Sequence, residues 1–223
     1  MPPRTLRVPL LRTSMVKIAV IDYDMGNLHS ACKGLENAGG HPQVSDDAET
    51  ILAADAFVLP GVGAFDPAMQ HLRAHGLEDT IAKAIDSGKP FLGICIGMQL
   101  LFDGSEEGSE PGLGIVPGMV RRFAAEPDIT IPHMGWNQLD YTQPENPLWQ
   151  GLGASPWTYF VHSYYTDPKD DDMKAATVSH GSQTVTAAIA CDNLMAVQFH
   201  PEKSSDAGLK LLANFVRLAE ARS

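Results

Sequence analysis

The chain has 223 residues, of which 44% are hydrophobic and 19% are charged, and its formal net charge is −11. This composition is typical of one large globular domain or two small ones and excludes a disordered chain. The acidic balance makes nucleic acid and anionic membrane surfaces poor partners, and no apolar run approaches the roughly 18 residues that a membrane span needs.

The first fourteen residues differ in character from the rest. They carry Arg4, Arg7 and Arg12 but no acidic residue, and their one apolar patch, 8–11, is interrupted by Pro9. That patch is too short for the core of a signal peptide. We therefore expect residues 1–14 to form a disordered leader ahead of a domain spanning residues 15–223.

From Met15 to about residue 104, short apolar runs alternate with amphipathic stretches. The runs at 16–22, 41–45, 56–59 and 90–94 indicate strands. Helices are expected from Leu28 to the glycines at 39–40, over 48–54, and in a region with apolar positions 69, 72, 81 and 85 that stops at Gly88. A further helix is expected to run on from Cys95 through Phe102. Such alternation is typical of a parallel, helix-covered sheet that binds ligands at the carboxyl ends of its strands.

After Gly104 the chain becomes rich in glycine and proline, and strand-like runs occur at 115–123, 157–165, 175–179, 184–190 and 196–199. Short turns such as 180–182 indicate antiparallel additions to the sheet. Leu209, Leu212, Val216 and Ala219 predict a closing helix, with Ser204 or Ser205 as its cap. We see no linker and no internal repeat, so the sequence predicts a single α/β domain with a mostly parallel central sheet.

The three cysteines Cys32, Cys95 and Cys191 are odd in number and widely spaced, with no C-x-x-C pair. This arrangement argues against a metal site or a redox pair. It favours a reducing compartment, which predicts a cytoplasmic protein.

The sequence Gly93-Ile94-Cys95-Ile96-Gly97 lies between a predicted strand and a predicted helix. A nucleophile elbow needs this context, because glycines two residues away on either side leave room for the strained turn that exposes the nucleophile. A helix N-terminus beside the sulfur would favour the thiolate and could hold an oxyanion. The motif alone is equally compatible with a structural cysteine buried in a tight turn.

His200-Pro201-Glu202 follows an apolar strand and supplies what a nucleophilic cysteine needs. In an extended segment, residues two apart face the same side, so Glu202 could accept a hydrogen bond from one ring nitrogen of His200 while the other faces the sulfur. Taken alone, the tripeptide is better explained as a strand-end histidine with a surface glutamate. Combined with the elbow, it indicates an acyl-transfer site.

The segment 60–65, Pro-Gly-Val-Gly-Ala-Phe, follows another predicted strand and is therefore expected at the same edge of the sheet as Cys95. Its two glycines would allow the backbone to approach a ligand or turn an N–H toward an oxyanion. A plain turn explains this segment at least as well. No Walker or dinucleotide-binding motif is present, so nucleotide binding is not expected.

These residues resemble the class I, or triad, glutamine amidotransferases, most closely the glutaminase subunits of imidazole glycerol phosphate synthases in histidine biosynthesis. The resemblance extends from Val16 to the end of the chain. It is carried by residues 93–99 and 200–202 for the general family and by 22–27, 60–65, 131–137, 159–165 and 198–204 for the subfamily.

The resemblance implies a mechanism for the residues already singled out. Cys95 would attack the side-chain amide of glutamine, His200 would move the proton, and Glu202 would orient the imidazole. Glutamine-binding residues implied by the family are Gly63, Gln99, Ser163 and Tyr164. Oxyanion donors would come from Gly61, Val62, Gly63 and Ile96. The resemblance implies neither a cofactor nor a metal.

The resemblance also implies a partner, because free ammonia is mostly protonated near neutral pH and is then a poor nucleophile. The expected partner is a (β/α)8-barrel cyclase subunit, joined as a heterodimer, that receives the ammonia and forms imidazole glycerol phosphate. Trp136, Tyr159 and Lys203 fall where the family places the subunit interface. Coupling of glutamine hydrolysis to the liganded partner is expected through the backbone of 61–63.

Two alternatives remain at this point. The chain could supply ammonia to another synthase, such as one making pyridoxal phosphate, anthranilate or GMP, although the block at 133–137 argues against these. It could instead be a non-enzymatic stress or chaperone-like protein with a cysteine elbow. Such a protein would not need His200, Glu202 or a glutamine pocket.

Overall fold

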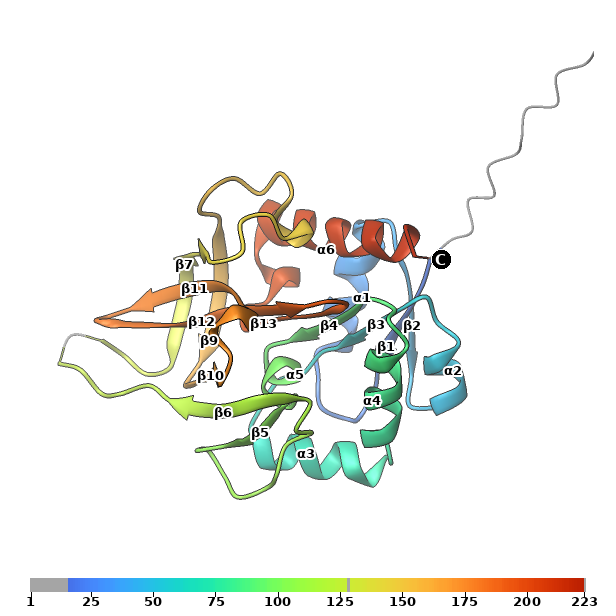
Figure 1. The fold of residues 1–223 in the computed structure, drawn as a ribbon, viewed down its shortest axis with the longest axis horizontal. Helices are drawn as coiled ribbons and strands as arrows, with labels where there is room; N and C mark the ends of the chain where they lie inside the picture. The colour runs from blue at the N-terminus through green and yellow to red at the C-terminus, as the bar shows by residue number, and fades with distance from the viewer. Residues whose placement is uncertain (1–15, 128, 223) are drawn as a thin grey trace, which may run out of the picture.

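The central sheet is built from strands β1 (Lys17–Ile21), β2 (His41–Ser45), β3 (Ala56–Leu59), β4 (Phe91–Ile94), β8 (Asp140–Tyr141), β11 (Lys174–His180), β12 (Gln183–Cys191) and β13 (Leu194–Val197). In this computed structural model, which describes residues 16–127 and 129–222, their order is β2-β1-β3-β4-β13-β12-β11-β8 (Figure 1). The strands from β2 to β13 are parallel, and the remaining three are antiparallel additions. Since parallel strands end at one edge, β3, β4 and β13 bring the residues that follow them together.

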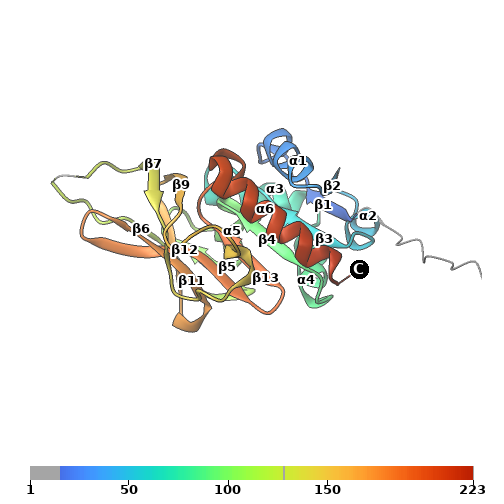
Figure 2. The same ribbon diagram turned by 90° about the horizontal axis from the view of Figure 1, so that it is seen from above.

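Helices cover both faces of the sheet because successive side chains of each strand enter opposite apolar layers. In β1, Ile18 and Val20 belong to one layer, whereas Ala19 and Ile21 belong to the other. Helices α1 (Leu28–Asn37) and α6 (Ser205–Glu220) pack on the first layer, where Figure 2 shows them side by side. Helices α2 (Ala48–Leu52), α3 (Phe65–Ala74) and α4 (Glu78–Asp86) pack on the second.

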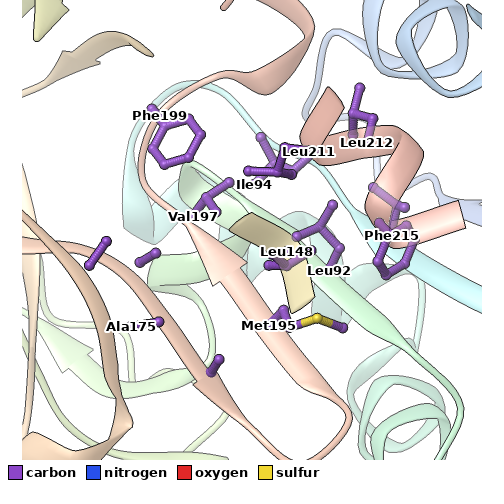
Figure 3. Close-up of a cluster of buried hydrophobic side chains, with 14 of the residues drawn as sticks. Leu92, Ile94, Leu148, Ala175, Met195, Val197, Phe199, Leu211, Leu212 and Phe215 are labelled. Atoms are coloured by element: carbon purple, nitrogen blue, oxygen red, sulfur yellow. The ribbon is translucent and has the colours of Figure 1, made fainter. Parts of the chain in front are cut away.

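Helix α6 is held against β4 and β13 by a buried apolar cluster (Figure 3). The cluster includes Leu92 and Ile94 of β4, Met195 and Val197 of β13, and Leu211, Leu212 and Phe215 of α6. Full burial of one such side chain stabilises a fold by about 1.5–3 kcal/mol. The packing fixes the ends of β4 and β13, after which Cys95 and His200 follow.

Two smaller sheets lie beside the central one. Strands β5 (Phe102–Ser105), β6 (Val116–Arg122) and β10 (Tyr164–Pro168) form the first. Strands β7 (His133–Gln138) and β9 (Trp157–His162) pair antiparallel, and we call this pair the β7–β9 ribbon. The short helix α5 (Ile96–Gln99) and the 3-10 turns η1 (Pro147–Trp149), η2 (Asp171–Met173) and η3 (Pro201–Lys203) complete the described elements.

Two predicted segments are divided in the structure. The helical region ending at Gly88 forms α3 and α4, because Gly76 between them has φ +65°, a conformation that ends a helix. The run predicted as one strand over 157–165 forms β9 and β10, which separate at Ser163 and pair with different strands.

The prediction that a helix continues from Cys95 through Phe102 is wrong. Helix α5 ends at Gln99, and Phe102 begins β5. The carbonyl of Leu101 accepts hydrogen bonds from the N–H groups of Ile115 and Val116 instead of continuing the helix. A fully buried apolar run has no exposed face, so its periodicity does not separate helix from strand.

The expected serine cap of the closing helix is also different. Ser204 occupies the N-cap position of α6, but its hydroxyl does not cap the helix. It donates to the carbonyl of His200 at 2.6 Å and accepts from the N–H of Tyr159 at 3.0 Å. Ser204 therefore stabilises the position of His200.

The predicted fold class, a single α/β domain with a mostly parallel sheet and antiparallel additions, is confirmed. The expected leader, residues 1–14, lies outside the described residues. In the part of the chain that the structure describes, no helix is both long enough and apolar enough to cross a membrane.

Candidate active site

Cys95 lies at the sharp turn between β4 and α5, where its own N–H continues the ladder to β13 by donating to the Val197 carbonyl at 2.8 Å. Its φ of +55° and ψ of −111° are strained for a residue with a side chain. The N–H groups of Met98 and Gln99 donate to the Cys95 carbonyl. These bonds show that the helix starts directly at the nucleophile candidate.

The two glycines of the elbow lie where an added side chain has no space, at Gly97, or very little, at Gly93. A Cβ on Gly97 would lie 1.8 Å from the carbonyl oxygen of Leu59 in β3, and a Cβ on Gly93 would lie 3.0 Å from the carbonyl oxygen of Gly97. The first contact would force backbone atoms apart, because Leu59 belongs to a buried strand. Gly97 therefore allows α5 to pack tightly against the end of β3.

His200 follows β13 and forms a buried pair with Glu202. Its Nδ1 donates to Oε1 of Glu202 at 2.8 Å, and the two side chains are only 2% and 5% exposed. Because a carboxylate accepts but does not donate, Nδ1 carries the proton and Nε2 is left for other partners. The expected contact is present, but the expected extended backbone is wrong, because Glu202 lies in the 3-10 turn η3.

The surroundings of His200 favour its charged form. Burial by itself lowers the pKa of His200, but Cys95 and Glu202 outweigh burial and raise that pKa to about 9. Its Nε2 is buried and forms no well-aligned hydrogen bond with any described residue, although the Cys95 thiol is close enough to raise the pKa. This arrangement allows a proton to pass between Sγ and Nε2.

A cavity of about 310 Å³ opens beside Cys95 and His200. Its other lining residues are Val62, Gly63, Ile96, Gln99, Glu107, Pro132, Val161, His162, Ser163 and Tyr164. All four predicted glutamine-binding residues and three of the four predicted oxyanion residues are in this set. These residues, which were singled out in the sequence, therefore lie around a single cavity.

Gly61 is the one predicted oxyanion residue that does not line this cavity. It lies behind it, because a Cβ on Gly61 would be 2.2 Å from the Tyr23 hydroxyl and 3.1 Å from Cβ of Ile96. The same hydroxyl donates to the carbonyl of Pro60 at 2.8 Å. Residues 60–61 are therefore anchored, whereas Val62 is 38% exposed and Gly63 has φ +105°.

A buried amide network joins Gln99 to the sulfur. The Gln99 side-chain nitrogen donates to the Tyr164 carbonyl at 3.2 Å and to Oε1 of Gln198 at 2.9 Å. The Gln198 nitrogen in turn lies 3.7 Å from Sγ of Cys95. Gln99 is therefore fixed between the cavity wall and the nucleophile.

The residues predicted at a subunit interface lie outside the cavity. Trp136 is 49% exposed and opposes the half-buried Tyr159 across the β7–β9 ribbon, with ring centroids 6.0 Å apart. Lys203 is exposed in η3. The N–H of His200 donates to the carbonyl of Tyr159 at 3.0 Å, so the ribbon directly contacts the site.

Three polar or charged residues of the cavity and the amide network had no assigned role in the sequence prediction: Glu107, His162 and Gln198. Gln198 could have been found, because it lies within the block 198–204 that carries the family resemblance and is only two positions before His200. His162 lies within the family-like block 159–165, which does not by itself give the residue a role. Glu107 carried no signal, because it lies in a polar loop between two strands.

Comparison with known proteins places this geometry in one family. The family model described as "Glutamine amidotransferase class-I" matches residues 19–219. The "Imidazole glycerol phosphate synthase subunit HisH" of Gloeothece citriformis is 70% identical over 202 residues, covering 91% of this chain and 96% of the relative. The protein of the same name from Acaryochloris marina is 69% identical over 204 residues, covering 92% and 95%.

Solved structures agree with the fold. A structure described as a glutamine amidotransferase has a TM-score of 0.71 at 21% identity, covering 91% of this chain and 98% of that one. A chain of PurLQS from Thermotoga maritima also has a TM-score of 0.71, at 19% identity and with 91% and 98% coverage. At these identities the likeness concerns the fold alone.

Proposed function

Because this chain belongs to the class I glutamine amidotransferase family, we propose that Cys95, His200 and Glu202 are the residues with which it hydrolyses glutamine. Its function is that of the glutaminase subunit of imidazole glycerol phosphate synthase, since relatives with about 70% identity over most of the chain have that name. The observation that carries the catalytic assignment is the buried His200–Glu202 pair beside the strained Cys95.

In the first half of the proposed reaction, Sγ of Cys95 attacks the side-chain carbonyl carbon of glutamine. Protonated Nε2 of His200 gives its proton to the amide nitrogen, the C–N bond breaks and ammonia leaves. The resulting thioester is hydrolysed by water, whose proton His200 accepts. The Glu202 carboxylate stabilises each imidazolium that forms, which agrees with its contribution to the raised pKa of His200.

Two parts of the cavity have the chemistry that this reaction requires. The Ile96 N–H at the first position of α5 has no acceptor within its own helix, so it can donate to the oxyanion together with N–H groups of Val62 and Gly63. Glutamine would be held by Gly63, Gln99, Ser163 and Tyr164. Glu107, the one carboxylate among the cavity's lining residues, supplies a charge partner for the α-ammonium group of glutamine.

We further propose that a (β/α)8-barrel cyclase subunit docks on the β7–β9 ribbon as a heterodimer and receives the ammonia for synthesis of imidazole glycerol phosphate. Among the described residues, three of the five exposed large hydrophobic side chains lie on this ribbon, namely Met134, Trp136 and Trp157. An exposed apolar group of this kind is typical of a protein interface. Val161 of the same ribbon lines the cavity, so a partner bound here would sit at its mouth.

The function is tested by measuring ammonia release from glutamine with the purified chain alone and with the cyclase partner and its nucleotide ligand. We expect slow release alone and at least about tenfold faster release in the liganded complex, because partner binding would align the N–H groups of 62–63. Equal rates in the two conditions would contradict coupling. The absence of release in both would contradict the glutaminase assignment.

The docking surface predicts that Trp136→Ala weakens binding of the partner by about 2 kcal/mol, or roughly 30-fold, because buried tryptophan anchors dominate many interfaces. Isothermal titration with the cyclase subunit measures this change. Val44→Ala is the matched control, since Val44 is 43% exposed on β2 at the far edge of the central sheet. Equal affinities of the two variants would show that the ribbon is not part of the interface.

A reducing compartment such as the cytoplasm is also part of the proposal. Cys32, Cys95 and Cys191 are all free, and catalysis requires the Cys95 sulfur to remain a thiol or thiolate. Pull-down with each candidate partner would show whether the chain binds the cyclase subunit or one of the competing synthases named above.

A further inference from the structure

Beyond the proposed triad, and resting on it, we propose that Gln198 is a positioning residue that holds the Cys95 sulfur as a thiolate through its side-chain N–H. Gln198 is fully buried at the end of β13, two positions before His200. Its Nε2 lies 3.7 Å from Sγ of Cys95, and its Oε1 accepts from Gln99 at 2.9 Å. Among the described residues, the Cys95 sulfur is the one hydrogen-bond partner of the Gln198 side-chain N–H, so this buried donor is aimed at the nucleophile.

The orientation of the Gln198 amide decides the sign of its effect. An N–H toward sulfur stabilises negative charge, whereas an amide oxygen toward sulfur would oppose it. Gln99 imposes the first orientation, because its own nitrogen lies between two acceptors, Oε1 of Gln198 and the Tyr164 carbonyl. Turning the Gln99 amide around would place its oxygen against the Tyr164 carbonyl oxygen.

The Tyr164 carbonyl is itself held by a pair of neutral histidines. Nδ1 of His162 donates to it at 2.8 Å, and because a carbonyl only accepts, His162 must carry its proton on Nδ1. Its Nε2 then accepts from Nδ1 of His133 at 3.1 Å. Burial, followed by neighbouring charges, lowers the pKa of His162 to about 3 and that of His133 to about 4, which keeps both rings neutral.

The far end of the hydrogen-bond chain lies on the β7–β9 ribbon. The Asn137 side-chain nitrogen donates to Nε2 of His133 at 3.1 Å and to the Ser179 carbonyl at 2.8 Å. The carbonyl oxygens of Ser179 and Tyr164 can only accept hydrogen bonds. They therefore determine which group donates and which accepts at each step between Asn137 and Sγ of Cys95. This network fixes which end of the Gln198 side-chain amide faces the sulfur, and none of its members is charged.

Other titratable groups also face the sulfur and are unchanged by a substitution of Gln198. They are His200 and Glu202 after β13, Tyr23 after β1, and His162 and Glu107 around the cavity. The contribution of Gln198 must therefore be measured as a difference from the wild type.

The test is the pH dependence of iodoacetamide alkylation at Cys95 in the full chain, followed by peptide mass spectrometry because Cys32 and Cys191 also react. In Gln198→Met, which keeps the length of the side chain but removes the N–H, we expect the midpoint to rise by about one pH unit. Below the midpoint, the alkylation rate should fall roughly tenfold. Asn214→Leu is the control, because it removes another buried amide that does not line the Cys95 cavity and that donates to the carbonyls of Leu148 and Gln150.

An unchanged midpoint in folded Gln198→Met, or an equal shift in Asn214→Leu, would overturn the proposal. If Gln198→Met does not fold, Gln99→Met decides, because it frees the Gln198 amide to turn; a smaller upward shift supports the proposal and no shift overturns it. Ammonia release by the wild-type complex is measured in parallel. Its absence would refute the glutaminase function, whereas an unchanged midpoint in an active protein would refute only the role of Gln198.

Discussion

Replacement of Cys95 by alanine is expected to reduce ammonia release from glutamine by about 10⁴- to 10⁶-fold, because no other group in the cavity can form the thioester. Synthesis of imidazole glycerol phosphate by the complex should then depend entirely on added ammonia. The ammonia-dependent rate should remain, since the partner's own active site is unaltered. Coupled assays with glutamine and with ammonium salts measure both rates on one preparation.

Cys191→Ala is the matched control for this experiment. Cys191 is an exposed free cysteine at the end of β12, outside the lining of the cavity. Glutamine-dependent synthesis should be unchanged in this variant. If Cys95→Ala retains glutamine-dependent synthesis, the nucleophile is misassigned; if it loses the ammonia-dependent rate as well, Cys95 has a structural role in docking.

Glu202→Gln is expected to lower the rate of glutamine hydrolysis by about 10³- to 10⁴-fold while leaving the fold intact. The glutamine nitrogen would donate to Nδ1 of His200, which would move the ring proton to Nε2, facing the sulfur. The imidazole could then no longer accept a proton from the thiol. Glu202 also has a buried oxygen, Oε2, that makes no hydrogen bond to a described residue, so its replacement does not break a second structural contact.

The pH profile distinguishes this effect from a loss of folding. Together with Cys95, the Glu202 carboxylate raises the pKa of His200 above its ordinary value, so the imidazolium persists up to about pH 9 in the wild type. Removing the negative charge lowers that pKa, and the alkaline loss of the residual activity should therefore move to lower pH. Asp206→Asn, an exposed acidic position in the first turn of α6, should change neither rate nor profile. A Glu202→Gln profile with the wild-type alkaline midpoint would contradict the role of this carboxylate.

Strands β3 and β4 could be predicted because each is a short apolar run beside a proline, Pro60 after β3 and Pro90 before β4. β3 was predicted with its observed bounds, and β4 within one residue. Hydrophobic periodicity alone does not predict that Cys95 and His200 lie close together. Their proximity depends on β13, which is parallel to β4 although β5 to β12 lie between them in the chain.

The β7–β9 ribbon was the least predictable part near the site. In β7, Met134 and Trp136 face outward while His133 is buried, so the strand has its apolar side chains in solvent and a polar one inside. This pattern is opposite to the one that predicts a strand. Only the resemblance to known glutaminase subunits drew attention to this block.

The backbone bond between the N–H of His200 and the carbonyl of Tyr159 makes residue 200 a link between the central sheet and the β7–β9 ribbon. His200 is attached to the central sheet through β13, yet its backbone amide is bonded to a two-stranded ribbon that, among the described residues, exposes Met134, Trp136 and Trp157. A protein that binds against Tyr159 would therefore displace His200, the residue that carries the proton, with no residue between them. The same displacement would then change both the fit of a partner on the outer face of the ribbon and the proton transfer between His200 and Sγ of Cys95.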